Sequence, residues 1–179
     1  DAYNQTGSLP DESAFATDGN FAFFADATNQ AALKGGDTAA ILKAHFDKVK
    51  AGDYVGILAY IERDQATRDW IHTLQTQVRD AKKVATAGQF GPRFLHSTGQ
   101  DYKGGPNSGV FLQITSDAAE DLPIPGRKLG FSTVVAAQAR GDFAVLAERG
   151  RRALRVHLKG GDTKAGLVRV AAALKMAVV

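Results

Sequence analysis

The chain has 179 residues, of which 44% are hydrophobic and 23% charged, and its formal net charge is +3. These values are typical of one globular domain with an apolar core, and the basic residues are too dispersed to indicate nucleic-acid binding. The sequence contains no cysteine, which excludes disulfides, thiolate zinc sites and cysteine nucleophiles and fits a cytoplasmic protein. No apolar run reaches the roughly 18 residues that a membrane helix needs, so we expect no membrane partner.

The first part of the chain differs in composition from the rest. Residues 1–20 are polar and rich in Gly, Ser, Pro and acidic side chains, so we expect a linker or an arm there. The chain starts at Asp1 rather than at a methionine, and we expect it to be a piece of a longer protein. The aromatic run Phe21–Ala25 predicts a strand or a segment packed on the body, and it opens the single domain that we assign to residues 21–179.

Helical and strand patterns alternate from there to the end. Asp37 caps a helix that Gly52 ends. Continuous apolar runs of strand length, such as Tyr54–Ile61, are typical of strands buried on both faces of a sheet. We expect Gly141 and Asp142 to interrupt the helical pattern that follows residue 131. The predicted strands are 54–61, 84–87, 110–115 and 153–158, and the further helices are 67–82, 131–139, 143–149 and 163–177.

Alternating strands and helices indicate right-handed βαβ units. The sequence therefore predicts an α/β fold, a three-layer, doubly wound parallel sheet with helices on both faces. In such sheets ligands gather at the carboxyl ends of the strands. The loop 88–97 leaves the carboxyl end of the predicted strand 84–87, so His96 is expected at that edge.

The segment 91–115 holds proton-transfer, hydrogen-bonding and anion-binding groups more densely than any other part of the chain. His96 has two interpretations, because an imidazole can carry a proton between oxygen atoms near neutral pH or can simply hydrogen-bond at the start of a helix. We interpret the other three histidines, His45, His72 and His157, as packing or surface residues. No two histidines have a metal-ligand spacing with a nearby carboxylate, so we expect no metal site.

Polar residues continue beyond His96. Ser97, Thr98 and Gln100 offer hydroxyl and amide groups that suit a sugar or a phosphate at a helix N-terminus, although N-capping alone would also account for Ser97 or Thr98. Lys103 precedes a Gly-Gly pair and would bring a cation and a close backbone to an anion, but no P-loop pattern surrounds it. Ser97 lacks a GxSxG context, which argues against a hydrolase triad.

Three motifs in this block, LHSTGQ at 95–100, KGGPN at 103–107 and GVFLQIT at 109–115, closely resemble the carboxyl-terminal part of phosphoglucose isomerase. The similarity is to the form fused behind a transaldolase in bifunctional bacterial enzymes, and it covers roughly residue 21 to the end. The flanking similar segments are GDYVGILAYI, RDAKKVAT, DLPIPG, AAQARGDF and LAERGRRALRVHL. The resemblance implies a sugar isomerase (SIS) domain that interconverts glucose 6-phosphate and fructose 6-phosphate without a cofactor.

The resemblance also implies roles for single residues. In the family, a histidine helps to open the sugar ring, a carboxylate moves a proton between C1 and C2 through an enediol, and hydroxyl-rich loops hold the phosphate. His96 matches the ring-opening histidine, and we take Ser97, Thr98, Gln100 and Lys103 as substrate-binding candidates.

The chain departs from the family pattern in two respects. The catalytic glutamate is expected near the end of the helix 67–82, which offers only Asp80, with Glu62 as a second choice. The family's phosphate loop and glycine-arginine segment lie upstream, so we expect preceding SIS and transaldolase domains in the same polypeptide, a homodimer, and no activity from this chain alone. Two alternatives stay open: a non-catalytic phosphosugar-binding domain, and a structural appendage that packs on a partner domain.

Overall fold

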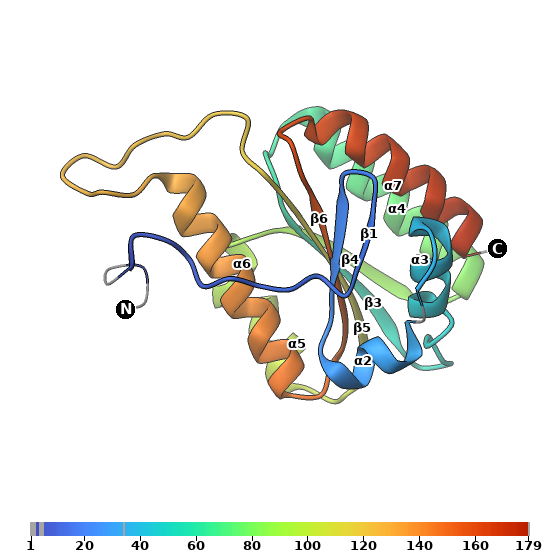
Figure 1. Ribbon diagram of the computed structural model, residues 1–179. Coiled ribbons are helices and arrows are strands. Elements are labelled where there is room, and N and C mark those ends of the chain that lie inside the picture. The colour runs from blue at the N-terminus through green and yellow to red at the C-terminus, as the bar shows by residue number, and fades with distance from the viewer. Residues whose placement is uncertain (1–2, 4–5, 34, 179) are drawn as a thin grey trace.

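Helices cover both faces of a six-stranded sheet (Figure 1). This architecture is that of a computed structural model, which describes residue 3, residues 6–33 and residues 35–178. The strands are β1 (Ala16–Asp18), β2 (Phe21–Phe24), β3 (Tyr54–Tyr60), β4 (Ala85–Phe90), β5 (Gly109–Ser116) and β6 (Arg152–Leu158). The helices are α2 (Ala27–Ala32), α3 (Thr38–Phe46), α4 (Gln65–Lys82), α5 (Thr98–Gly104), α6 (Phe131–Glu148) and α7 (Thr163–Ala177), with a 3₁₀ turn, η1, at Arg93–His96.

The strands lie in the order β1-β2-β6-β5-β3-β4. Strands β3, β4, β5 and β6 are parallel, which confirms the predicted α/β fold with a mostly parallel sheet between helices. Strands β1 and β2 form an antiparallel hairpin that extends the sheet beyond β6, with Phe21 opposite Leu158. Residues 21–25, expected to form a strand or a packed segment, therefore contain strand β2. Residues 16–18, at the end of the expected arm, form β1 and pair with β2.

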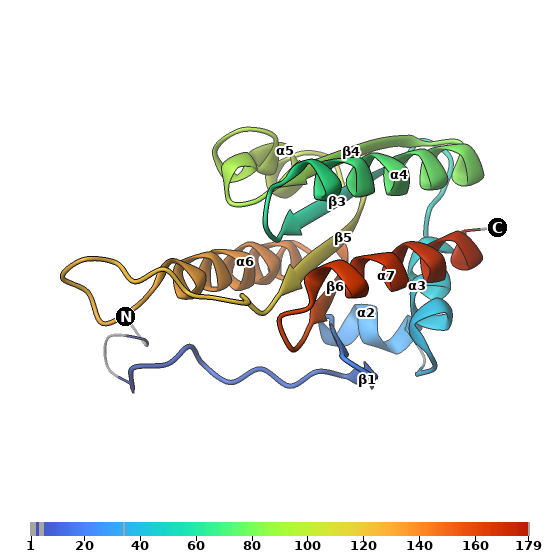
Figure 2. The same ribbon diagram turned by 90° about the horizontal axis from the view of Figure 1, so that it is seen from above.

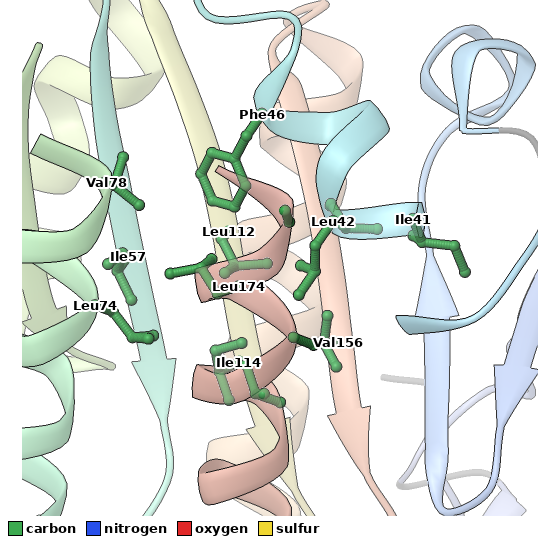
Figure 3. Packing of buried hydrophobic residues seen from close by; sticks show 14 of the residues in the cluster. Ile41, Leu42, Phe46, Ile57, Leu74, Val78, Leu112, Ile114, Val156 and Leu174 are labelled. Carbon is green, nitrogen blue, oxygen red and sulfur yellow. The ribbon is translucent and has the colours of Figure 1, made fainter. Parts of the chain in front are cut away.

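The two faces of the sheet have different covers. Helices α3, α4 and α7 lie on one face, and α5 and α6 lie on the other (Figures 1 and 2). Alternate residues of a strand point to opposite faces, so Ile57 of β3 joins the first core cluster and Leu58 joins the second. In the first cluster Leu112 and Ile114 of β5 lie against Leu174 of α7 (Figure 3). Both faces of the central strands are thus buried, which explains their continuous apolar runs.

Aspartates begin several helices, as the sequence predicts for Asp37. The side chains of Asp37 and Asp162 accept hydrogen bonds from the backbone of the first turns of α3 and α7, and Asp64 forms a capping box with Thr67 at the start of α4. These bonds satisfy backbone N–H groups that have no partner within the helix. Helix α3 ends earlier than predicted, at Phe46 rather than next to Gly52.

Helix α6 corrects a prediction. The sequence predicts two helices broken at Gly141 and Asp142, but one continuous helix runs from Phe131 to Glu148. Asp142 faces inward, where its carboxylate accepts a hydrogen bond from the Tyr60 hydroxyl and pairs with the Lys103 ammonium group. These tertiary contacts outweigh the weak helix propensity of a Gly-Asp pair.

Among the helices of the described residues, none is both long enough and apolar enough to span a membrane.

Candidate functional site

A cavity of about 1220 Å³ opens at the carboxyl edge of the sheet. Its wall includes residues at or just beyond the ends of β3, β5 and β6, the first turns of α6 and α7, and part of the N-terminal arm. Strand β3 lies between β4 and β5 in the sheet. The chain passes from β3 to β4 on one side of it, and then crosses to β5 on the other side of β3. This reversal makes the gap between β3 and β5 a topological switch point, which is where open α/β sheets bind ligands.

Polar side chains interrupt the apolar alternation on the α6 face, close to this cavity. Gln113 and Thr115 lie on β5, and their register partners on β6 are Arg155 and His157. All four residues are buried or partly buried, and they lie on strands whose other residues are mostly apolar. Sequence reasoning missed this cluster because it assigned 110–115 and 153–158 as strands without asking which face each polar residue occupies. The signal that could have found it is the spacing of two, which places each polar pair on one face.

Both ring nitrogens of His157 have partners. Nδ1 lies 2.9 Å from Thr115 Oγ1, and Nε2 lies 3.1 Å from Asp117 Oδ1. Because an ionised carboxylate can only accept, the neutral imidazole donates from Nε2 and accepts the Thr115 hydroxyl at Nδ1. Burial lowers the pKa of His157, and the charge of Asp117 opposes that shift only in part. Asp117 also accepts a hydrogen bond from the Gly160 amide at 2.9 Å, which joins two loops of the cavity.

His96 lies beyond the carboxyl end of β4, at the last position of η1. Its side chain is exposed, and its imidazole has no hydrogen-bond partner among the described residues. Phe94 in the same turn is buried against Tyr60 and Tyr102, so the turn is anchored on its inner side. The arrangement presents an unengaged imidazole to solvent beyond the carboxyl end of β4, and His96 is not among the residues that line the edge cavity.

The residues that follow His96 are mostly engaged within the chain. Ser97 is the N-cap residue before α5, but its side chain forms no capping bond, and its hydroxyl oxygen lies 3.4 Å from the Phe94 carbonyl oxygen. The Thr98 hydroxyl donates to Gln89 Oε1 at 2.7 Å, and Gln100 Nε2 donates to the Leu95 carbonyl at 2.6 Å. Short α5 is thus fixed on β4 and η1 by its own polar side chains.

Lys103 points into the protein rather than toward solvent. Its Nζ lies 2.6 Å from Asp142 Oδ1, where the Asp142 side chain is 1% exposed. The Tyr60 hydroxyl donates to the other carboxylate oxygen at 3.0 Å, and burial raises the pKa of Tyr60 well above its ordinary value. This network connects β3, α5 and α6, so in this conformation the cation predicted to contact substrate serves as a structural link.

The structure does not bring Asp80 and His96 together. Asp80 lies near the carboxyl end of α4, before β4 begins, whereas His96 lies after β4 ends. The two residues are therefore at opposite edges of the sheet, about 20 Å apart along a strand of this length. Asp80 is exposed and accepts a hydrogen bond from Arg79 Nε at 2.8 Å, which lowers the pKa of its carboxyl group.

Glu62 lies at the carboxyl edge instead. It follows β3 directly at the switch point, is exposed and lines the cavity. Register places Ala59 of β3 opposite Phe90 of β4, so Glu62 and the 91–96 segment leave the sheet from neighbouring strands. Gly91 starts that segment, and a Cβ atom there would meet the Tyr60 ring at 2.4 Å. Only glycine lets the backbone pass so close to that ring.

The described residues include no group of three or more His, Asp or Glu side chains placed to hold a metal ion.

The structure is thus that of an α/β protein with a cavity at the switch point of its sheet. No protein-family model matches the chain, and no curated protein matches it. Among solved structures, the chain is similar to a hypothetical protein, TT0462 from Thermus thermophilus, with a TM-score of 0.62 and 15% sequence identity. The match covers 84% of this chain and 41% of that one, so the chain spans less than half the length of that protein. At this identity, the likeness establishes the fold.

Proposed function

We propose that this chain supplies the carboxyl-terminal half of an aldose–ketose isomerase acting on glucose 6-phosphate and fructose 6-phosphate. The observation that carries the proposal is the exposed, unengaged imidazole of His96, within the LHSTGQ segment and beyond the carboxyl end of β4. Ring opening needs a group that exchanges protons with the ring oxygen and the C1 hydroxyl near neutral pH, and imidazole is suited to that task.

The second chemical step needs a carboxylate that moves a proton between C1 and C2. We assign this role to Glu62 rather than to Asp80, because Glu62 lines the cavity next to the 91–96 segment and Asp80 lies at the opposite edge. The Glu62 carboxylate has no side-chain partner among the described residues, so it is available to a ligand.

The phosphate group of the substrate would be held outside this chain. The resemblance puts the phosphate loop in a preceding SIS domain, and Lys103 is occupied by Asp142. The proposal therefore includes preceding SIS and transaldolase domains in one polypeptide, a homodimer and a cytoplasmic location. The chain's coverage of 41% of a longer protein of the same fold supports a larger parent.

The test is the turnover of fructose 6-phosphate to glucose 6-phosphate by the natural polypeptide. We expect His96→Ala and Glu62→Gln each to lower kcat by about 10²–10⁴-fold, the usual contribution of general acid–base catalysis. The matched controls are His72→Ala, an exposed histidine on α4, and Asp80→Asn, and we expect both to keep full turnover. Circular dichroism would check the fold of each variant. Unchanged turnover in folded His96→Ala would overturn the proposal.

A second candidate is a non-catalytic phosphosugar-binding domain. The observation that favours it is that serine, threonine and arginine side chains line the edge cavity, whereas His96 is not among its lining residues. Under this alternative, the natural polypeptide would bind fructose 6-phosphate in a calorimetric titration without converting it, and His96→Ala would not change the affinity.

A further inference from the structure

Two arginines from different elements converge on one carboxylate oxygen of the N-terminal arm. Arg140 of α6 places Nε 2.7 Å from Glu12 Oε2, and Arg155 of β6 places Nη2 2.8 Å from the same atom. Two guanidinium groups therefore share a single negative charge. Such paired planar donors match the oxygens of carboxylates and phosphates.

Arg155 is an unusual residue for the inside of a sheet. It is 3% exposed, and its guanidinium carbon lies 4.1 Å from the centre of the Phe24 ring and 5.3 Å from that of Phe143. Its Nε has no hydrogen-bond partner among the described residues, and neither does Oε1 of its register partner, Gln113. Buried polar atoms normally have partners. The Nε of Arg155 is thus a donor that Glu12 does not satisfy.

The arm that carries Glu12 has no regular secondary structure around that residue. Residues 8–14 form neither helix nor strand, and Arg140 Nη1 donates to the Pro10 carbonyl at 2.6 Å. The arm is next anchored at Phe15, whose amide donates to the Phe23 carbonyl. The Glu12 side chain is 31% exposed, so water reaches the ion pair. Among the described residues, the polar contacts of residues 8–14 with the body of the protein are thus those of the two arginines.

The arginine pair also faces the edge cavity. Arg140, Arg155 and Glu12 all line it, and so do hydroxyl groups from the strand ends and from the first turn of α6. A ligand with an anionic head and a hydroxylated body would find partners for both parts. The hydroxyl-bearing residues are Thr115, Ser116, Ser132 and Thr133.

We propose that Arg140 and Arg155 form a binding site for a phosphate monoester, and that Glu12 of the arm occupies this site until the ligand displaces it. A phosphate dianion neutralises both guanidinium charges, whereas Glu12 neutralises one. It also offers more acceptor oxygens than the single carboxylate oxygen that the two arginines now share. Because ligand and arm compete, binding would release residues 8–14 from the body. The site is separate from His96 and does not depend on the isomerase proposal.

The test is a calorimetric titration of the 179-residue chain with inorganic phosphate and with methyl phosphate. Glu12→Gln removes the competing charge and should tighten both affinities by about tenfold or more, the value of a charge-assisted contact. Adding Arg140→Gln to Glu12→Gln should abolish that gain. Arg149→Gln, an exposed arginine at the end of α6, is the matched control and should leave the gain intact. Arg140 is used because its side chain is 37% exposed, so its replacement should not unfold the chain.

A second measurement follows the arm itself. Amide hydrogen exchange across residues 6–15 should become faster when methyl phosphate is added to the wild-type chain, while exchange in β5 stays slow. Equal phosphate affinity for wild type and Glu12→Gln, or an equal loss with Arg149→Gln and Arg140→Gln, would overturn the proposal and leave the arginines as an anchor for the arm. Neither result involves turnover, so the His96 test stands independently.

Discussion

Alternate residues of the same strand meet two different surroundings in this protein. On β5, Val110, Leu112 and Ile114 join an apolar cluster with α3, α4 and α7, whereas Gln113 and Thr115 face the side of α6. The first face is held by burial of apolar area, which is strong but has no chemical selectivity. The second face combines apolar contacts with paired polar groups, and these groups surround the cavity. The comparison separates a face that is held by apolar burial alone from a face that also carries paired polar groups beside the cavity.

The largest change in the free energy of unfolding is expected from a substitution on the polar face. Asp142→Ala should lower the free energy of unfolding by about 3–5 kcal/mol, because it leaves the Lys103 cation half-buried without its partner. Urea denaturation followed by circular dichroism would measure the loss. The double variant Lys103→Met with Asp142→Leu removes both charges and should recover most of it. A loss below about 1 kcal/mol for Asp142→Ala would show that the pair is not intact in solution.

Neighbouring residues of β5 compare the two faces directly. Leu112→Ala should cost about 3 kcal/mol, since it opens a cavity in the fully buried apolar cluster. Gln113→Leu should change stability by no more than about 1 kcal/mol, because it loses one hydrogen bond to Ala139 and removes a carbonyl oxygen that has no partner. Urea denaturation of both variants would give the difference. Equal losses would contradict the distinction between the faces.

His45 places an imidazole in the apolar face. It is fully buried, burial lowers its pKa to about 3, and the nearby backbone of Phe111 offsets that effect only in part. The unfolded chain takes up this proton near pH 6.5 and the folded chain does not, so stability is lost as pH falls. Between about pH 7 and pH 5 the loss from this group should be about 2 kcal/mol.

Thermal or urea unfolding as a function of pH would measure the His45 effect. His45→Leu should flatten the dependence between about pH 7 and pH 5. His72→Ala, on the exposed side of α4, should not alter it. A steep dependence that survives in His45→Leu would assign the acid sensitivity to other groups.

The smallest change in stability is expected from a substitution that tests whether α6 is continuous. Gly141 lies in the middle of this helix, and a Cβ atom there would have nothing within 4 Å. Gly141→Ala should therefore stabilise the protein by about 1 kcal/mol. Gly150 has equal space but a φ of +63°, so Gly150→Ala should destabilise the protein. Differential scanning calorimetry would detect both shifts. A destabilising Gly141→Ala would indicate that the helix is interrupted.

Much of the fold could be predicted because local signals agreed with the tertiary structure. The apolar run at Tyr54–Ile61 and the capping residue Asp37 mark elements that the structure contains. The β1–β2 hairpin and the continuous α6 could not be predicted, since both depend on partners far along the chain: β6 for the hairpin, and Tyr60 with Lys103 for Asp142.

In the candidate site, the sequence could predict a residue's position only where the order of strands alone determines it. His96 lies beyond the carboxyl end of β4, as the strand order implies. The positions of Asp80 at the opposite edge and of Lys103 in an internal ion pair depend on helix direction and on side-chain orientation, which a spacing pattern does not fix. The Arg155 and Glu12 contact joins residues near the two ends of the chain, and no local pattern reveals it.

The pairing of β2 with β6 has a consequence for how the protein is made. Phe21 and Phe23 are among the first apolar residues of the domain to leave a ribosome, and their strand partners, Leu158 and Val156, are among the last. The β1–β2 hairpin therefore lacks its partner strand β6 through most of the synthesis of the domain. The sheet can be completed only after β6 has emerged. A polypeptide cut short before β6 would expose two buried phenylalanines on an open strand edge, a form prone to aggregation.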